Sequence, residues 1–174
     1  MKVSVEEVEK IDEAVKAANA VEKSKDVIET ASKIHVEYST KIDSRVTVID
    51  RKKLPEFLEV TFKNGQYWTV KTDEDIVVYR LFGNNAEAGG AFATTSPAIN
   101  RIQSKIDSAI LPEWKNTLKY EAEIVIPKCT VLSIGKDEEQ ITVSGTKLAG
   151  GADQVLLPEG WDLNWIQNIR TVNP

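Results

Sequence analysis

The feature that most constrains this chain is a strand-forming run with an arginine inside it. Residues Ile76–Phe82 are apolar or aromatic at nearly every position, which predicts a strand buried on both faces of a sheet. Arg80 is the exception, and a guanidinium is rarely buried unless it pairs with an anion or lines a cleft. The run therefore predicts either a ligand site at Arg80 or a structural ion pair between Arg80 and a carboxylate.

Glycines and hydroxyl side chains follow this strand. Gly83 and Asn84-Asn85 end it, Gly89-Gly90 marks a second turn, and Ala91–Thr95 returns as a short strand. An arginine, a glycine-bearing loop and a row of hydroxyls together favour a site for a phosphorylated ligand. The alternative is an ordinary hairpin beside a structural arginine.

Length, charge and cysteine content narrow the classes of function. A chain of 174 residues is one domain, or one domain with an appendage. The net charge of −5 argues against a general nucleic-acid binder, because phosphate binding needs a basic surface. One cysteine and one histidine exclude an internal disulfide and a zinc site built from these ligands alone. No apolar run approaches the length of a membrane span, so we expect no membrane partner. From the net charge we expect no nucleic-acid partner, and we expect no metal.

Hydrophobic periodicity predicts two helices among many strands. Apolar residues recur at helical spacing over Ser4–Lys33, and Ser4 with Glu7 forms a capping box. Apolar residues at helical spacing also predict a helix over Ala98–Ile110. Asn64-Gly65 predicts a two-residue hairpin turn. The other predicted strands are Ile34–Ser39, Arg45–Ile49, Leu54–Phe62, Gln66–Lys71, Lys119–Ile126, Thr130–Ile134, Gln140–Val143, Val155–Leu157 and Ile169–Val172. The predicted class is α+β.

Three short motifs occur in order along the second half of the chain. They are YRLFG at Tyr79–Gly83, GGAFATTSP at Gly89–Pro97 and GGADQVLLP at Gly150–Pro158. Together they resemble the TNT family, the NAD-hydrolysing toxin domains of bacterial polymorphic toxin systems. The resemblance covers Val77–Pro174. It implies a toxin domain over residues 71–174, preceded by a helical and strand lead-in over residues 1–70. The implied fold is ADP-ribosyltransferase-like, with a split β-sheet that grips NAD between its halves.

The resemblance also implies roles for particular residues. Arg80 matches the arginine that contacts the NAD phosphates, and Gln154 stands where transferases carry a catalytic glutamate and TNT-type hydrolases a glutamine. Thr94, Thr95 and Ser96 match the strand that supports the nicotinamide ribose. The remaining candidates for substrate binding are Gly83, within the first motif, and Tyr79 and Phe92, whose rings can stack on nicotinamide or adenine.

The chemistry implied is hydrolysis of an N-glycosidic bond. Nicotinamide leaves as a neutral group from a cationic nitrogen, so no general acid is needed, unlike in most O-glycosidases. The Gln154 amide can accept a hydrogen bond from the ribose or position water, but it is no strong base. Asp153 is the alternative acidic group, and strand alternation predicts that it points away from Gln154. Without the resemblance, Gln154 reads as a surface residue after a Gly-Gly turn.

Other readings use the same residues. If the adenine of NAD, rather than water, captured the ribose cation, the enzyme would be an ADP-ribosyl cyclase. A mono-ADP-ribosyltransferase fits less well, because Ala152 stands where a second acid is expected. A non-catalytic binding module on the same fold is a further alternative. Some family members place a histidine in the cleft, whereas His35, the one histidine, precedes the arginine strand and reads as structural; Trp114 is a candidate to take its place.

The resemblance implies partners and a location as well. NAD(P)+ is expected as substrate rather than as cofactor, and no bound cofactor is expected. A toxin that destroys NAD would kill its producer, so a cognate immunity protein is expected. The chain is expected to be secreted, or delivered into the cytoplasm of a target cell, as the C-terminal part of a larger toxin.

Overall fold

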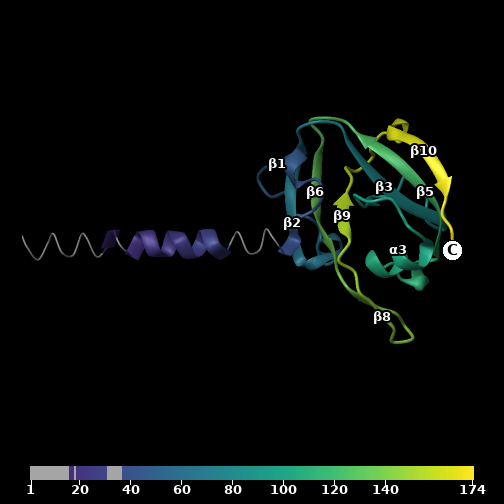
Figure 1. Cartoon of the computed structure of the whole chain (residues 1–174), viewed down its shortest axis with the longest axis horizontal. Coiled ribbons are helices and arrows are strands. Elements are labelled where there is room, and N and C mark those ends of the chain that lie inside the picture. The colour runs from purple at the N-terminus through teal and green to yellow at the C-terminus, as the bar shows by residue number, and fades with distance from the viewer. Residues whose placement is uncertain (1–15, 18, 31–36) are drawn as a thin grey trace, which may run out of the picture. The chain divides into compact units, whose positions relative to one another are not determined.

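The computed structural model describes residues 16, 17, 19–30 and 37–174, which belong to two compact units (Figure 1). In the first unit, Met1–Glu37, residues 16, 17 and 19–30 are helical, which confirms the predicted N-terminal helix at those positions. The remainder of that predicted helix and His35 lie outside the described residues. So does most of the predicted strand Ile34–Ser39, and residues 37 and 38 are helical rather than extended.

The second unit, Tyr38–Pro174, is built on antiparallel strands, ten of them within the described residues. The strands are β1 (Val46–Val48), β2 (Phe62–Thr72), β3 (Ile76–Asn84), β4 (Phe92–Ala93), β5 (Asn116–Ile126), β6 (Val131–Asp137), β7 (Gln140–Ile141), β8 (Lys147–Leu148), β9 (Asp153–Leu156) and β10 (Ile166–Thr171). The helices are α2 (Glu56–Glu59) and α3 (Arg101–Asp107), with short 3-10 turns η1 (Asp43–Arg45), η2 (Pro112–Trp114) and η3 (Leu163–Trp165). The predicted α+β class is confirmed.

Two sheets form the body of this unit. One has the order β1-β2-β6-β9-β4, and the other the order β10-β5-β3. In Figure 1 the first sheet lies on the left of the unit and the second on the right, with α3 below them. A separate two-stranded hairpin, β7-β8, extends away from both sheets (Figure 1). The unit begins at Tyr38, and β2 runs across the domain boundary predicted between residues 70 and 71.

The largest of three apolar clusters joins the two sheets. Val70 and Ile134 come from the larger sheet, Val78 and Ile124 come from the smaller one, and none is more than 1 % exposed. Burying an aliphatic side chain of this size contributes about 1.5–3 kcal/mol. The strand around Arg80 is therefore part of the core, as its apolar sequence predicts.

The backbones of the two sheets meet at one residue pair. Tyr79 of β3 and Thr94, just after β4, exchange two backbone hydrogen bonds of 2.8 Å each. On either side of this bridge the sheets diverge, because β3 otherwise pairs with β5 and β4 with β9. The divergence leaves room for a pocket between the sheets.

The prediction of a hairpin at Asn64-Gly65 is wrong. Both residues have positive φ, 53° and 65°, but β2 continues through them to Thr72. The pairing with β6 slips here, since Phe62 opposes Asp137 and Tyr67 opposes Gly135. Three additional residues on β2 are therefore accommodated as a bulge, which bends a strand without reversing it. The segment Leu54–Phe62, predicted to end as a strand, does so only at Phe62, where β2 begins, because α2 occupies its middle.

The second predicted helix is confirmed but shorter than expected. α3 covers Arg101–Asp107, and the Asn100 side chain caps it by accepting a 2.7 Å hydrogen bond from the Gln103 N–H. The predicted apolar face is not buried, since Ile99 is 81 % exposed and Ile102 66 %. The C-terminal end of α3 is held instead by backbone hydrogen bonds to residues 150 and 152.

Candidate functional site

A pocket of about 250 Å³ opens between the two sheets. Five of the eight predicted site residues line it, although they come from three separate segments of the chain: Tyr79, Arg80, Phe92, Thr94 and Gln154. We call this the Gln154 pocket. The structure therefore brings together the central residues of all three sequence motifs.

Gln154 is held in one orientation by Thr61. It lies on β9, is 5 % exposed, and donates from its amide Nε2 to Thr61 Oγ1 at 2.8 Å. The nitrogen end of the amide is thereby fixed toward Thr61, and its carbonyl oxygen is the end that accepts hydrogen bonds. Since Gln154 lines the pocket, its amide is a suitable acceptor for a hydroxyl of a bound ligand.

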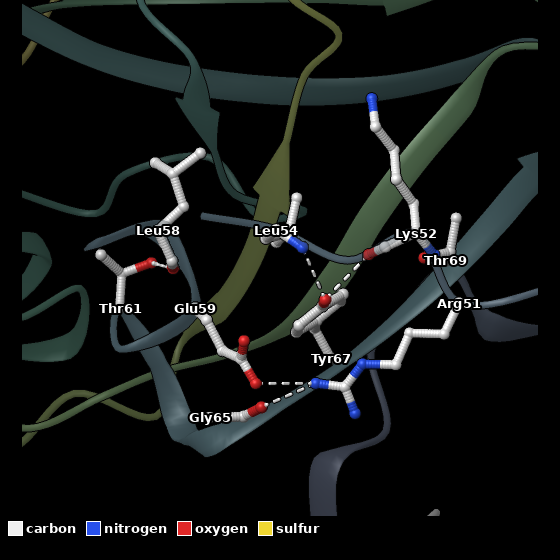
Figure 2. Close-up of polar contacts among 9 residues, drawn as sticks. All are labelled: Arg51, Lys52, Leu54, Leu58, Glu59, Thr61, Gly65, Tyr67 and Thr69. Atoms are coloured by element: carbon white, nitrogen blue, oxygen red, sulfur yellow. Dashed lines mark hydrogen bonds and ion pairs between the residues drawn. The ribbon is translucent and has the colours of Figure 1, made fainter. Parts of the chain in front are cut away.

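Thr61 is itself positioned by a network on the segment before β2. Its Oγ1 donates to the Leu58 carbonyl at 2.6 Å. Nearby, the buried Tyr67 hydroxyl donates to the Lys52 carbonyl at 2.8 Å and accepts from the Leu54 N–H at 3.1 Å. Figure 2 shows these contacts surrounding the Tyr67 hydroxyl. They tie residues 52–54 to β2.

Arg51 closes the same network from the outside. Its guanidinium lies 4.1 Å from the centre of the Tyr67 ring, a cation–π distance, and pairs with Glu59 at 3.1 Å (Figure 2). Lys52 and Thr69 add a backbone-to-hydroxyl bond of 2.8 Å. The segment that carries Thr61 is thus fastened to β2 at several points.

Arg80 is bound by backbone carbonyls rather than by a carboxylate. Its Nε donates to the Glu87 carbonyl at 2.8 Å and its Nη1 to the Phe92 carbonyl at 2.7 Å. Among the residues that the structure describes, Arg80 forms no ion pair, so the structural-pair interpretation is wrong for this part of the chain. Burial lowers the pKa of the guanidinium from its ordinary value, yet an arginine stays charged. Arg80 therefore places a cation at the pocket that pairs with no carboxylate of residues 16, 17, 19–30 or 37–174.

Gly90 makes the position of Arg80 possible. A Cβ at residue 90 would lie 1.8 Å from Arg80 Nη2. The second glycine of the Gly89-Gly90 pair is therefore required by close approach of the guanidinium, not only by the turn. Trp161 holds the same loop by donating from Nε1 to the Gly90 carbonyl at 3.2 Å.

Three predicted site residues do not line the Gln154 pocket. Gly83 is buried in β3 at φ 146°, where a Cβ would lie 2.3 Å from the Thr117 hydroxyl oxygen. Thr95 donates to Asp153. Ser96 accepts from Lys41 Nζ at 2.5 Å and lines a second pocket, of about 410 Å³.

The second pocket contains Asp153, which explains how neighbouring residues of β9 separate. Gln154 is opposite Gly135 of β6, and Asp153 is opposite Lys136. Because successive side chains of a strand point to opposite faces, Gln154 faces the first pocket and Asp153 the second. Asp153 accepts from the Lys41 N–H at 2.8 Å and from Lys136 Nζ at 2.5 Å. We call this the Asp153 pocket.

The structure adds an acidic residue that sequence reasoning missed. Asp137, at the end of β6, lines the Gln154 pocket. Its carboxyl group has a pKa raised well above the ordinary value, mainly by burial and further by the charge of Asp153. A hydrogen bond with the Ser108 side chain and the charge of Lys136 act in the opposite direction. Its place depends on the pairing of β6 with β9: Gly135 lies opposite Gln154, and Asp137, two residues further along β6, shares that face.

Trp114 is the second residue that the structure adds to the pocket wall. It ends η2, is 52 % exposed and lines the Gln154 pocket. The substitution of an aromatic side chain for the missing histidine, an alternative raised from the sequence, is thus compatible with its location.

Comparisons with protein-family models, with curated proteins and with solved structures found no match to this chain. Within the described residues, no helix has the length and apolar character needed to cross a membrane.

Proposed function

We propose that this chain is an NAD+ glycohydrolase that releases nicotinamide from NAD(P)+, and that its fold is ADP-ribosyltransferase-like. The observation that carries the proposal is the convergence of Arg80, Gln154, Tyr79 and Phe92 on one pocket. Five of the eight residues predicted from the three motifs thus share a site, and its arginine, amide and aromatic rings suit the binding of NAD. The two sheets, which meet at Tyr79–Thr94 and diverge around the pocket, support a split-sheet fold.

The size of the pocket favours the nicotinamide end of the dinucleotide. About 250 Å³ lies just below the range of roughly 300–1,000 Å³ typical of small-molecule pockets. We therefore place the nicotinamide ribose inside and the adenosine half outside. Tyr79 and Phe92 supply rings for the nicotinamide, and the unused N–H groups of Arg80 supply donors for the first phosphate.

The reaction needs stabilisation of positive charge on the ribose. When the bond between C1′ and the nicotinamide nitrogen breaks, the electron pair goes to nicotinamide and the ribose becomes oxocarbenium-like. The Gln154 carbonyl oxygen would accept a hydrogen bond from a ribose hydroxyl and hold the sugar as this charge develops. Delivery into a target cell as part of a larger toxin, and a cognate immunity protein, belong to the same proposal.

The test is product analysis with a matched pair of variants. The chain is mixed with NAD+, and the products are separated by chromatography. We expect nicotinamide with ADP-ribose, and a loss of about 10²–10³-fold in kcat for Gln154→Ala. Gln167→Ala is the control, because Gln167 is exposed on β10, away from the pocket.

Each other product pattern has a defined meaning. Cyclic ADP-ribose would replace hydrolysis by cyclisation, and ADP-ribose attached to proteins of an added cell extract would indicate a transferase. NAD+ that survives intact with and without extract would contradict the proposal in favour of a binding module. Equal activity of Gln154→Ala and the parent would show that the site is assigned wrongly.

A further inference from the structure

Hydrolysis at this site requires a base that Gln154 cannot supply. A water molecule that bonds to C1′ becomes strongly acidic and must lose a proton. An amide is not protonated at neutral pH, so Gln154 can orient this water but cannot take its proton. Another group in the pocket must therefore accept this proton.

Two carboxylates line the pocket, Asp137 and Glu138. Glu138 is engaged elsewhere, because its Oε2 accepts from the Asn64 N–H at 2.6 Å and its Oε1 from the Glu139 N–H at 3.0 Å. Both carboxylate oxygens of Glu138 are thus already accepting hydrogen bonds from the backbone. Asp137 is therefore the carboxylate left to act.

We propose that Asp137 is the general base that deprotonates the attacking water. Its carboxylate shares the pocket face of Gln154, because Gly135 lies opposite Gln154 and Asp137 is two residues further along the same strand. This role rests on the proposed hydrolysis of NAD+. The bond from water oxygen to C1′ forms, the bond from C1′ to nicotinamide nitrogen breaks, and the water proton passes to the Asp137 carboxylate.

The charged groups around Asp137 set the direction of its pH dependence. Asp153 on β9 and burial both favour its protonated form, while Lys136 on β6 and the Ser108 side chain favour the carboxylate. Arg80 on β3 and Glu138 also line the pocket. Burial dominates, so the pKa of Asp137 lies well above the ordinary value of an aspartate. A base works only when deprotonated, so turnover should rise with pH through this raised pKa.

Two backbone hydrogen bonds fix the position of Asp137 beside the third sequence motif. Its N–H donates to the Ala152 carbonyl at 2.8 Å, and its carbonyl accepts from the Gly151 N–H at 2.9 Å. A Cβ at Gly150 would lie 2.8 Å from that same carbonyl oxygen. The Gly150-Gly151 pair of the third motif thus packs directly against the residue that we assign as base.

The experiment compares NAD+ hydrolysis by the parent, Asp137→Asn and Asp50→Asn across pH. Asp137→Asn keeps the size of the side chain and should lower kcat by about 10²–10⁴-fold with little change in KM. Asp50 is exposed and outside both pockets, so Asp50→Asn should match the parent. Thermal unfolding of each variant establishes that it is folded.

A second variant separates a base from a structural residue. Ser108→Ala removes the hydrogen bond that favours the carboxylate, so the rising limb of kcat against pH should move to higher pH. A direct NMR titration of the Asp137 carboxyl carbon in the free parent protein should give the same raised pKa as the rising limb of kcat/KM, which reports the free enzyme.

The outcomes distinguish this inference from the proposed function. If the parent cleaves NAD+ and Asp137→Asn does so equally well with the same pH profile, Asp137 is not the base but the hydrolase proposal stands. A carboxyl pKa of Asp137 in the ordinary range would overturn the inference in the same way. If the parent itself releases no nicotinamide, the proposed function fails, and the role of Asp137 fails with it.

Discussion

The two pockets share part of a wall, formed by Leu81, Thr94 and Ser108, but the charged side chains that line them differ in their partners. In the Asp153 pocket the charges are compensated, since Asp153 accepts from Lys136 Nζ and from a backbone N–H. In the Gln154 pocket the partners of Arg80 among the described residues are backbone carbonyls, and Asp137 has a raised pKa.

We interpret this difference as one between a stabilising network and the proposed active site. Compensated charges add connections to a fold, whereas uncompensated ones are retained at a cost and are typical of functional sites. Two adjacent residues of β9 therefore have different expected roles: Asp153 stabilises the fold, and Gln154 belongs to the proposed active site.

The largest expected effect is on stability, from breaking the compensated network. Asp153→Ala removes a carboxylate that is 5 % exposed in its side chain and leaves Lys136 partly buried without its partner. Removing one member of a buried pair costs about 3–5 kcal/mol, and the 23 % exposure of Lys136 places our expectation near the lower end. Chemical denaturation measures the change in the free energy of unfolding, with Asp50→Ala as the exposed control.

The comparison would be broken if Asp153→Ala cost less than about 1 kcal/mol, the value of an exposed pair. Such a result would mean that the pair of Asp153 and Lys136 contributes no more to stability than an exposed ion pair does.

The next effect tests the uncompensated arginine. Gly90→Ala places a Cβ where Arg80 Nη2 lies, so the guanidinium must move. Such overpacking costs about 1–3 kcal/mol, and it should also weaken NAD+ binding, measured as a rise in KM in the hydrolysis assay. Gly89→Ala is the matched control, because its Cβ would meet only the end of the exposed Leu163 side chain, which can move aside. Equal NAD+ affinity of the two variants would remove Arg80 from the binding site.

The smallest effect concerns the orientation of Gln154. Thr61→Val deletes the oxygen that accepts from Gln154 Nε2, and one hydrogen bond is worth about 1 kcal/mol. We expect kcat to fall by roughly five- to tenfold with KM nearly unchanged. Thr61→Ser should restore it, and Thr171→Val, at an exposed position of β10, should have no effect. A rise in KM with unchanged kcat would mean instead that Thr61 contacts the ligand and does not act by positioning Gln154.

Local patterns in the sequence predicted the elements whose signals are local. The strand around Arg80 and the α+β class are confirmed. Gln154 and Arg80 were predicted from motifs seventy residues apart, and the structure places both on one pocket. In contrast, Asn64-Gly65 has the positive φ values of a hairpin turn but forms a bulge, because pairing with β6 decides the path of the chain.

Features that depend on distant contacts could not be read from the sequence. Asp137 has the sequence surroundings of an ordinary acidic loop, and its raised pKa arises from burial and from Asp153, which β9 brings beside β6. The exposure of Ile99 and Ile102 is equally invisible in the helical period, which predicts a face but not what covers it.

The strand order also dictates when the site can exist during folding. β9 lies between β6 and β4, so residues 153–156 must insert between strands that are synthesised earlier. Contacts so distant in sequence form slowly, because their loop-closure entropy must be overcome first. A nascent chain that ends before β9 has no Gln154 and an incomplete pocket wall. The Gln154 pocket can therefore be complete only after β9 has been synthesised.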